Sequence, residues 1–239
     1  LSIYPALYIN QGNKTSKYST DEYNLNHSMY SMGANYGDLD NDGYLDFYVG
    51  TGAPDYSTIV PNRMFRNVNG KIFEEVTSAG NFGHIQKGHG IAFSDLDNDG
   101  DQDIYAVMGG AYEGDTFTNV LYENPIHENN WIVIELEGTK SNRSAIGAKV
   151  ELELDNGRKI YRTVSTGGSF GSSSLQLEIG LANANAVEQM LIHWPSGLKE
   201  SLENISVKQK IHITEGHGKF EIRKYQEIEF SKQHSRHHH

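Results

Sequence analysis

Two short loops carry carboxylates at a density and spacing suited to binding a metal ion. The first spans residues 38–46 and reads Asp-Leu-Asp-Asn-Asp-Gly-Tyr-Leu-Asp; the second, 57 residues later, spans 95–103 and reads Asp-Leu-Asp-Asn-Asp-Gly-Asp-Gln-Asp. Carboxylates this close repel one another unless a cation neutralises them. Side chains at positions 1, 3, 5 and 9, with a backbone carbonyl at position 7, make an all-oxygen cage that suits Ca²⁺ better than Mg²⁺. The alternative is two solvated acidic turns, but the shared spacing favours two calcium sites.

The residues around each loop exclude an EF-hand. An EF-hand needs a bidentate Glu at position 12 and flanking helices, whereas position 12 is Val49 in the first loop and Ala106 in the second. Gly43 and Gly100 stand at position 6, where the chain must turn sharply. The aromatic and β-branched residues that follow, 45–49 and 104–107, predict a strand leaving each loop directly.

Composition narrows the class of protein. The chain has 239 residues, 25 Gly, 14 Tyr and no Cys, which fits an all-β protein without disulfides. A formal charge of −11 argues against nucleic-acid binding, and no apolar run is long enough to span a membrane. Loop calcium sites usually need extracytoplasmic calcium levels, so we expect a secreted, cell-surface or periplasmic protein. No signal peptide is visible, and because Leu1 is not an initiator Met we expect a processed or excised chain.

Residues 1–128 contain a sequence repeat of 57 residues, a length that accommodates about four strands per copy. Each copy has a small apolar segment, an Asp loop, a strand, and then a short strand ending in Asn, at 63–67 and 120–124; residues 6–10 show the same ending. This period predicts blades of a β-propeller, about two blades and the end of a third. Closed propellers have about 4–8 blades, so the ring would be partial with an open edge.

Residues 129–216 differ from residues 1–128 in their pattern of apolar and polar residues. Apolar and polar residues alternate in several short segments, which predicts six or seven strands of a β-sandwich or small barrel. These segments are 131–137, 148–154, 159–164, 175–179, 187–194 and 210–214. Asp155-Asn156-Gly157 predicts a hairpin turn between two of them. Residues 217–239 are expected to be a polar tail, and His237–His239 resemble part of a purification tag.

Both parts resemble known families. Residues 37–43 and 94–101 resemble FG-GAP (VCBS-type) propeller repeats, as in integrin α-chain propellers. The later segment resembles the ASPIC/UnbV domain, and the combination is similar to the C-terminal part of cartilage-acidic-protein-like chains. The residues that carry the second resemblance are 130–131, 141–148, 167–170, 179–181 and 193–197.

The resemblance implies an extracytoplasmic protein with Ca²⁺ in each propeller loop and no established chemistry for the ASPIC/UnbV domain. It implies side-chain ligands at Asp38, Asp40, Asp42, Asp46, Asp95, Asp97, Asp99 and Asp103, and main-chain carbonyl ligands at Tyr44 and Asp101. The family's propellers normally have more repeats, so upstream blades or another chain would complete the ring.

Other candidate sites have simpler structural interpretations. His84 and His89 in a Gly-rich loop could bind a transition metal, but no third ligand is identifiable. The Gly/Ser-rich segment 166–174 lacks the Lys and spacing of a phosphate loop, which favours a connecting loop that could contact a sugar or a peptide. Ser196 is interpreted as part of a hairpin turn, not as a nucleophile. Loop aromatics are available either for blade packing or for glycan and protein partners: Tyr18, Tyr23, Tyr30, Tyr36, Tyr56, Tyr112 and Phe117.

These observations favour a calcium-binding, extracytoplasmic binding or adhesion module in which Ca²⁺ is structural. No catalytic residue is assigned. The alternative is the C-terminal portion of a secreted propeller enzyme, with a site on the propeller axis or at the domain interface. A third hypothesis is self-association through an open sheet edge.

Overall fold

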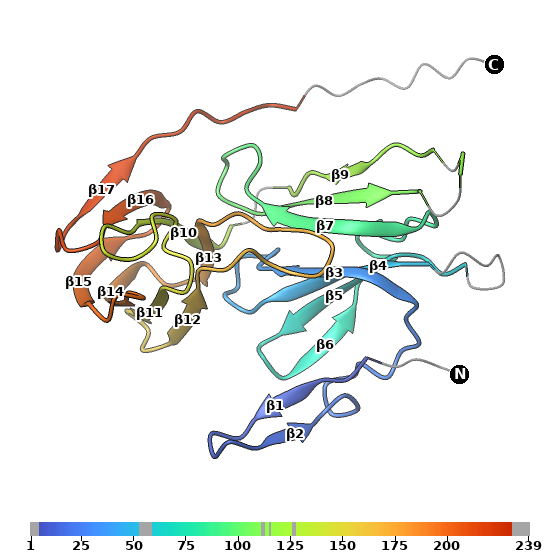
Figure 1. Cartoon of the computed structure of the whole chain (residues 1–239), viewed down its shortest axis with the longest axis horizontal. Helices are drawn as coiled ribbons and strands as arrows, with labels where there is room; N and C mark the ends of the chain where they lie inside the picture. Colours follow the sequence, from blue (N-terminus) through green and yellow to red (C-terminus); the bar gives the residue numbers. More distant parts are fainter. Residues whose placement is uncertain (1–4, 53–58, 111–112, 115, 126–127, 231–239) are drawn as a thin grey trace.

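The protein is built from strands alone in the part of the chain that the structure describes (Figure 1). A computed structural model describes residues 5–52, 59–110, 113–114, 116–125 and 128–230. Within these ranges there is no helix, so the expected all-β class is confirmed. Accordingly, a helix that is apolar and long enough to span a membrane does not occur among the described residues.

The N-terminal part forms three antiparallel sheets in succession. The first pairs β1 with β2, the second has the order β3-β4-β5-β6, and the third has the order β7-β8-β9. This succession of small meanders agrees with the expected propeller-like architecture, one four-stranded blade with parts of its neighbours. The strands are β1 (Tyr8–Asn10), β2 (Ser16–Tyr18), β3 (Ser31–Gly37), β4 (Asp46–Thr51), β5 (Arg63–Val68), β6 (Ile72–Glu75), β7 (Gly88–Ser94), β8 (Asp103–Met108) and β9 (Val120–Tyr122).

The second and third sheets pack against each other through a shared apolar core. Tyr48 and Met64 from one sheet and Ile91, Phe93 and Ile104 from the other are fully buried in one cluster. Glycine permits the close approach of the two sheets, because a Cβ on Gly50 would lie 2.5 Å from the Gly88 carbonyl oxygen. Each large side chain buried here contributes about 1.5–3 kcal/mol to folding.

The C-terminal part is a sandwich of two four-stranded sheets. One sheet has the order β13-β10-β16-β17, with β10 and β16 parallel, and the other has the order β12-β11-β14-β15. Their facing sides enclose a separate core that includes Ile132, Ile134, Leu152 and Ile179. The strands are β10 (Asn130–Glu137), β11 (Lys149–Leu154), β12 (Lys159–Thr163), β13 (Leu177–Ala182), β14 (Ala186–His193), β15 (Lys199–Ser206), β16 (Gln209–Thr214) and β17 (Phe220–Arg223).

Two edge strands of this sandwich differ from the sequence-based expectation. β15 was not predicted, because only Leu202 and Ile205 of its eight residues are buried and no clear alternation results. β17 lies inside the expected polar tail, yet it pairs antiparallel with β16. Its residues are half-buried or exposed, so this edge strand has a polar composition that cannot be distinguished from that of an unstructured tail. The remaining tail residues 231–239, including His237–His239, lie outside the described residues.

The loop between β12 and β13 joins the two halves of the molecule. In Figure 1 it reaches from the sandwich and lies between β3 and β7. Ala34 and Ser169 exchange backbone hydrogen bonds of 3.2 and 2.9 Å, and the Asn35 amide donates to Ser173 Oγ at 2.9 Å. Gly171 is needed for the fit, because a Cβ there would lie 1.9 Å from the Ile91 carbonyl oxygen. The Gly/Ser-rich segment is therefore a docking element as well as a connecting loop.

Candidate metal centres

In each acidic loop, three carboxylates lie close enough to share one ion. Asp38, Asp40 and Asp42 each offer an oxygen within 4.8 Å of the others, and Asp95, Asp97 and Asp99 do the same in the second loop. The glycine at position 6 has a positive φ in both loops, +87° at Gly43 and +100° at Gly100. That backbone conformation is readily adopted by glycine, which explains the residue type.

Side chains at positions 3 and 5 shape the loops from within. The backbone N–H of Asp42 donates to Asp40 Oδ1 at 3.3 Å, and the N–H of Tyr44 donates to Asp42 Oδ1 at 2.8 Å. The second loop repeats both bonds: Asp97 Oδ1 accepts from the next-but-one residue at 3.3 Å and Asp99 Oδ1 at 3.1 Å. Such Asx turns direct successive carboxylates toward the inside of a tight loop.

The aspartate at position 9 closes each loop instead of joining the group of three. Asp46 Oδ2 accepts from the Leu39 N–H at 2.9 Å, and its Oδ1 accepts from the Asn67 N–H at 2.7 Å. The equivalent Asp103 oxygens accept from Leu96 at 3.1 Å and Asn124 at 2.9 Å. The structure thus uses Asp46 and Asp103 to fix the loop to its own sheet, and their role as ligands stays a prediction.

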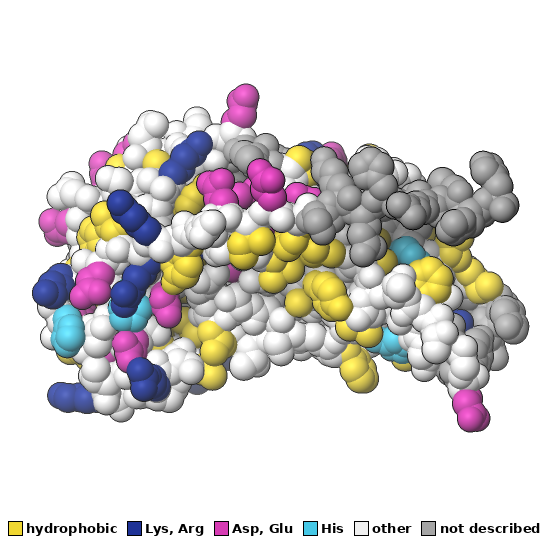
Figure 2. Space-filling model, turned by 90° about the horizontal axis from the view of Figure 1, so that it is seen from above, with side chains coloured by type: hydrophobic (Ala, Val, Ile, Leu, Met, Phe, Trp, Pro, Cys, Tyr) yellow, Lys and Arg dark blue, Asp and Glu magenta, His cyan; other side chains and the backbone are white. Residues whose placement is uncertain are grey.

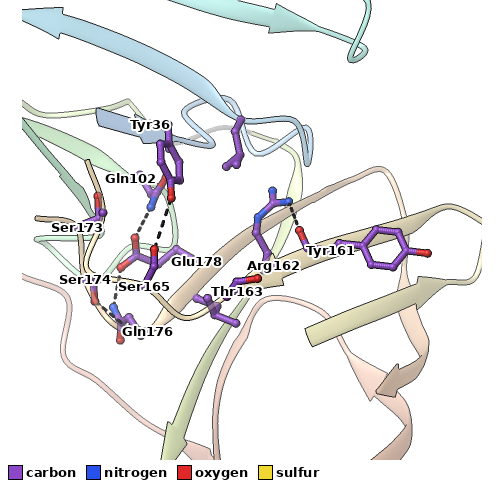
Figure 3. Close-up of a pocket in the computed structure, with 14 residues that line it drawn as sticks. Tyr36, Gln102, Tyr161, Arg162, Thr163, Ser165, Ser173, Ser174, Gln176 and Glu178 are labelled. Carbon is purple, nitrogen blue, oxygen red and sulfur yellow. Dashed lines mark hydrogen bonds between the residues drawn. The ribbon is translucent and has the colours of Figure 1, made fainter. Parts of the chain in front are cut away.

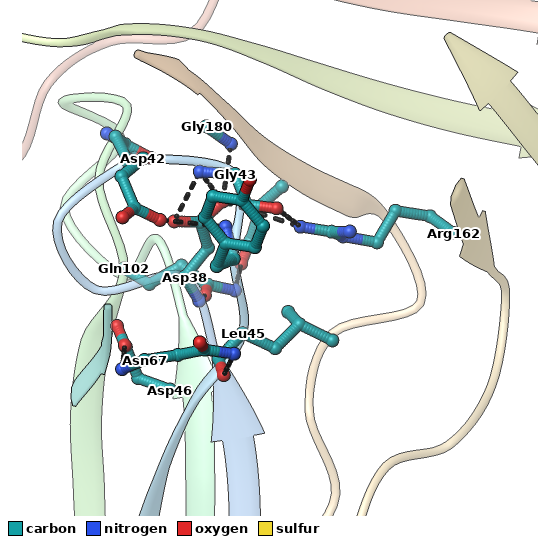
Figure 4. Close-up of polar contacts among 12 residues, drawn as sticks. Asp38, Asp42, Gly43, Leu45, Asp46, Asn67, Gln102, Arg162 and Gly180 are labelled. Carbon is teal, nitrogen blue, oxygen red and sulfur yellow. Dashed lines mark hydrogen bonds and ion pairs between the residues drawn. The ribbon is translucent and has the colours of Figure 1, made fainter. Parts of the chain in front are cut away.

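The aspartate at position 1 faces the sandwich in both loops, as Figure 4 shows for Asp38. Asp38 is 1% exposed; its Oδ2 accepts from the backbone N–H groups of Gly43 at 3.0 Å and Gly180 at 2.9 Å, and lies 3.5 Å from Arg162 Nη2. In the second loop, Lys210 Nζ lies 2.9 Å from Asp95 Oδ2. In each loop the aspartate at position 1 therefore pairs with one cation contributed by a sandwich strand.

The second loop contains buried carboxylate oxygens without a hydrogen-bond partner. Both side-chain oxygens of Asp95 and both of Asp101 are in this state among the described residues, although Asp95 has its ion pair with Lys210. Asp101 is only 4% exposed. An unsatisfied buried carboxylate is costly, and hard oxygen donors without protons are what Ca²⁺ requires. This donor set fits a hard divalent cation.

Burial changes the acidity of these groups. It raises the pKa of Asp101 to about 8, with Asp99 and Asp103 adding repulsion. Burial likewise raises the pKa of Asp46 to about 8 and that of Asp38 to about 7, although Arg162 opposes the shift at Asp38. Without a positive partner inside the loop, these carboxylates favour protonation, and a cation would compete for the same oxygens.

The predicted main-chain ligands Tyr44 and Asp101 occupy position 7, as the sequence indicates. The Tyr44 ring lies 4.2 Å beneath the guanidinium of Arg158, a sandwich residue that also donates to the Asp42 carbonyl. The buried side chain of Asp101 is a second source of oxygens that sequence reasoning did not propose. The role of these two carbonyls as ligands stays a prediction.

Sequence reasoning missed the residues that reach the loops from elsewhere. Arg158, Arg162 and Lys210 lie on or beside strands more than a hundred residues from the aspartates they approach, and no local pattern marks them. Asn67 and Asn124 did carry a signal, since each ends a short strand at the same offset from its loop. The amide of Asn124 donates to the carbonyls of Leu39 at 2.7 Å and Gln102 at 3.1 Å, which ties the two loops together.

The charge distribution matches this docking. Residues 1–128 contain 6 Lys and Arg against 18 Asp and Glu, whereas residues 129–223 contain 11 of each. Figure 2 shows the basic side chains on one face gathered at the sandwich end. An acidic propeller-like part therefore meets a neutral sandwich, three of whose cations, Arg158, Arg162 and Lys210, lie at the contact.

The histidine hypothesis gains no third ligand. Among the described residues, the groups of three side chains placed to share an ion contain only aspartates, so His84 and His89 belong to none. His84 Nδ1 instead accepts from the Gln86 N–H at 3.1 Å, a local turn bond. Of the loop aromatics proposed for partner binding, Tyr56 and Tyr112 lie outside the described residues, while Tyr36 is 44% exposed at the junction of the two halves.

Two segments of the chain match known protein families. A family model described as ASPIC and UnbV matches residues 138–220, and one described as an FG-GAP-like repeat matches residues 4–49. No curated protein matches the sequence. A crystal structure from Bacteroides fragilis NCTC 9343, provisionally described as a cell adhesion protein, is 8% identical, with a TM-score of 0.24 over 97% of this chain and 95% of that one. The chain thus carries an FG-GAP-like repeat followed by a domain of the ASPIC and UnbV family.

Proposed function

We propose that this chain is an extracellular, adhesion-like binding module whose two Asp loops each bind a structural Ca²⁺. The FG-GAP-like repeat and the ASPIC and UnbV domain support an extracellular setting. The loops support the ion: they are repeated, all-oxygen and placed where two sheets and the sandwich meet.

The observation that carries the proposal is the state of Asp101 and Asp95. Four carboxylate oxygens are buried there without a hydrogen-bond partner among the described residues. Lys210 supplies one positive charge, and it contacts Asp95 and not Asp101. A bound divalent ion would supply the missing charge and the missing contacts for this loop.

The proposed consequence of ion binding is a more stable junction between the two halves. Asp103 and Asp46 already hold each loop to the start of its strand, while Asp95 and Asp38 face the sandwich. Neutralising the carboxylates between these two anchor points would relieve their repulsion and stabilise the junction of the two halves. Metal binding and stability are then linked, because the unfolded chain has no preformed cage.

Thermal unfolding with and without calcium tests the proposal. An ion at 100 times its dissociation constant adds about 2.7 kcal/mol per site. For a chain of this size that is roughly 5–10 °C in Tm. Calorimetric titration of the chelator-treated protein is expected to give two Ca²⁺ per chain, with Mg²⁺ much weaker.

Matched variants assign the effect to the loops. Asp40→Asn and Asp97→Asn are each expected to remove one bound ion, and the double variant both. Glu203→Gln, which changes an exposed acid on β15, is the control and should leave binding unchanged. A Tm that does not respond to Ca²⁺, or equal binding by the double variant, would refute the proposal.

A further inference from the structure

A cleft at the junction of the two halves has the features of a ligand site. Its volume is about 380 Å³, within the roughly 300–1,000 Å³ typical of small-molecule sites. It lies between Tyr36 at the end of β3, Gln102 of the second loop, and residues from β12 to β13 of the sandwich (Figure 3). Neither half forms it alone.

The polar groups of this cleft form a preorganised floor. Glu178 Oε1 accepts from Gln176 Nε2 at 2.8 Å and from Ser94 Oγ at 3.3 Å, and its Oε2 accepts from the Gln102 amide. Gln102 Oε1 in turn accepts from the Asp38 N–H at 2.6 Å. Groups already held in place lose little freedom when a ligand binds, which favours affinity.

Hydrogen-bonding capacity is left over above this floor. The hydroxyls of Tyr36 and Ser165 are 3.5 Å apart, a long contact that a ligand hydroxyl could replace. The Thr163 hydroxyl lines the cleft, is exposed and makes no hydrogen bond among the described residues. The Oε1 of Gln176 also has no partner in the described part of the chain. Donors and acceptors are thus mixed, as a polyhydroxyl ligand requires, because each of its hydroxyls both donates and accepts.

The charges of the cleft disfavour an anionic ligand. Glu178 places a carboxyl group, an acid, in the floor. Among the described residues that line the cleft, Arg162 is the one base, and its guanidinium already contacts Asp38, the Gly43 carbonyl and the Tyr161 carbonyl. Phosphate and sulfate groups are recognised by accessible basic groups, whereas both Nη groups of Arg162 are engaged and its remaining Nε is buried. The Tyr36 ring, which is 44% exposed, instead offers an apolar face.

We propose that this cleft binds a neutral saccharide, stacked on Tyr36 and hydrogen-bonded by Thr163, Ser165 and Gln176. The inference deepens the binding role proposed above and rests on it, but the cleft is separate from the Asp clusters. Gln102 and Arg162 connect the two, since both contact the first loop and line the cleft. The calcium-loaded form is therefore the form to test.

The test uses the full chain with Ca²⁺ present and four neutral disaccharides: cellobiose, maltose, lactose and N,N′-diacetylchitobiose. Saturation-transfer-difference NMR detects binding, and calorimetry gives the affinity. At least one disaccharide is expected to bind, and Tyr36→Ala should weaken it about tenfold or more, as loss of an aromatic anchor does. Thr163→Val, which keeps the shape and removes the hydroxyl, should weaken it several-fold. Tyr18→Ala, an equally exposed tyrosine on β2 outside the cleft, is the control.

The outcomes separate this inference from the calcium proposal. If none of the disaccharides binds, if both cleft variants bind as tightly as the parent, or if inorganic sulfate occupies the cleft in preference, the saccharide site is wrong. If Tyr36→Ala lowers Tm, Thr163→Val with an unchanged Tm carries the test. The calcium proposal is judged independently by the Tm response to Ca²⁺, because neither Tyr36 nor Thr163 belongs to an Asp cluster.

Discussion

The carboxylate of Asp103 accepts a hydrogen bond from the backbone N–H of Asn124 at 2.9 Å, and the same relationship recurs 57 residues earlier between Asp46 and Asn67 at 2.7 Å. The C-terminal end of the third strand, β5 or β9, is thereby fixed to the last residue of the acidic loop, where the second strand, β4 or β8, begins. The repeated Asn in the sequence is explained by the hydrogen bonds that its side-chain amide donates to neighbouring carbonyls, because any residue other than proline could supply the backbone N–H.

Replacing these asparagines tests their role in loop closure. Asn124→Ala removes the two hydrogen bonds that the side-chain amide donates to the carbonyls of Leu39 and Gln102. It should lower the free energy of unfolding by about 1–3 kcal/mol. Asn67→Ala removes one hydrogen bond donated to the Leu45 carbonyl and one accepted from the Gly70 N–H. Both partners belong to the same sheet and its loops as Asn67. Urea unfolding of the chelator-treated proteins measures both. We expect the second loop to lose more Ca²⁺ affinity in Asn124→Ala than the first loop loses in Asn67→Ala. Equal affinity in both variants and the parent would contradict loop closure as the function of Asn124.

Lys210 tests the contact between the second loop and the sandwich. Its Nζ lies 2.9 Å from Asp95 Oδ2 and 2.7 Å from Asn98 Oδ1, and its side chain is 7% exposed. Lys210→Met leaves the buried Asp95 without a partner and should destabilise the metal-free protein by about 3–5 kcal/mol. Saturating Ca²⁺ should restore part of this loss, because a divalent ion compensates the same carboxylate. Lys199→Met, at an exposed position on β15, is the control for loss of a lysine.

The pH dependence of the metal-free protein follows from the raised pKa values. Asp101 has a pKa of about 8 in the folded protein, against 3.8 as its ordinary value. Between these values the folded state holds a proton that the unfolded state releases, so this contribution to stability is complete below about pH 4 and is lost as pH rises through 8. Chelator-treated protein should thus become less stable from pH 5 to 9, and Asp101→Asn should flatten that slope.

With Ca²⁺ present the trend reverses. The ion binds the deprotonated carboxylates, so its affinity should increase as pH rises through the same range. Calorimetry in buffers of different ionisation enthalpy should detect proton release on binding near neutral pH. Calcium affinity that stays constant from pH 6 to 9 would contradict the coupling between the ion and these acids.

Glu215 makes the opposite prediction, in the sandwich. It is 2% exposed, and its carboxylate accepts hydrogen bonds from Ser196 Oγ, from Ser141 Oγ at 2.9 Å, and from three consecutive backbone N–H groups, 139–141, at 2.7–2.8 Å. Burial alone would raise its pKa, but the hydrogen bonds prevail and lower it to about 2. Its contribution to stability is present above about pH 4.5 and is lost as pH falls toward 2.

Glu215→Gln should therefore lower the free energy of unfolding by about 1–3 kcal/mol at neutral pH, because an amide cannot accept all of these bonds. The variant should also lose the part of the acid transition that lies between pH 4.5 and 2. Glu221→Gln, on the exposed edge strand β17, is the matched control. Identical acid unfolding of Glu215→Gln and the parent would show that Glu215 does not join the loops at this end of the sandwich.

Local patterns in the sequence were enough to predict the strand-rich fold and the two loops. The 57-residue repeat identified two equivalent sheets because equivalent residues occupy equivalent places, and alternation identified β11 and β14 because each buries mainly one face. Patterns failed at β15 and β17, where edge strands bury too little on either face to differ from loops. In the same way, the positions of Gly43 and Gly100 could be assigned from the loop spacing alone.

The sequence by itself determined which residues could hold a cation, since the aspartates lie within nine positions of each other in each loop. Only the tertiary structure decided what surrounds them. Gly180 donates to Asp38 across 142 residues of sequence, and Lys210 reaches Asp95 from β16. Such contacts depend on how two distinct cores pack together, and that packing leaves no periodicity in the chain. The same physical reason hides the cleft beside Tyr36, whose walls come from segments that only docking brings together.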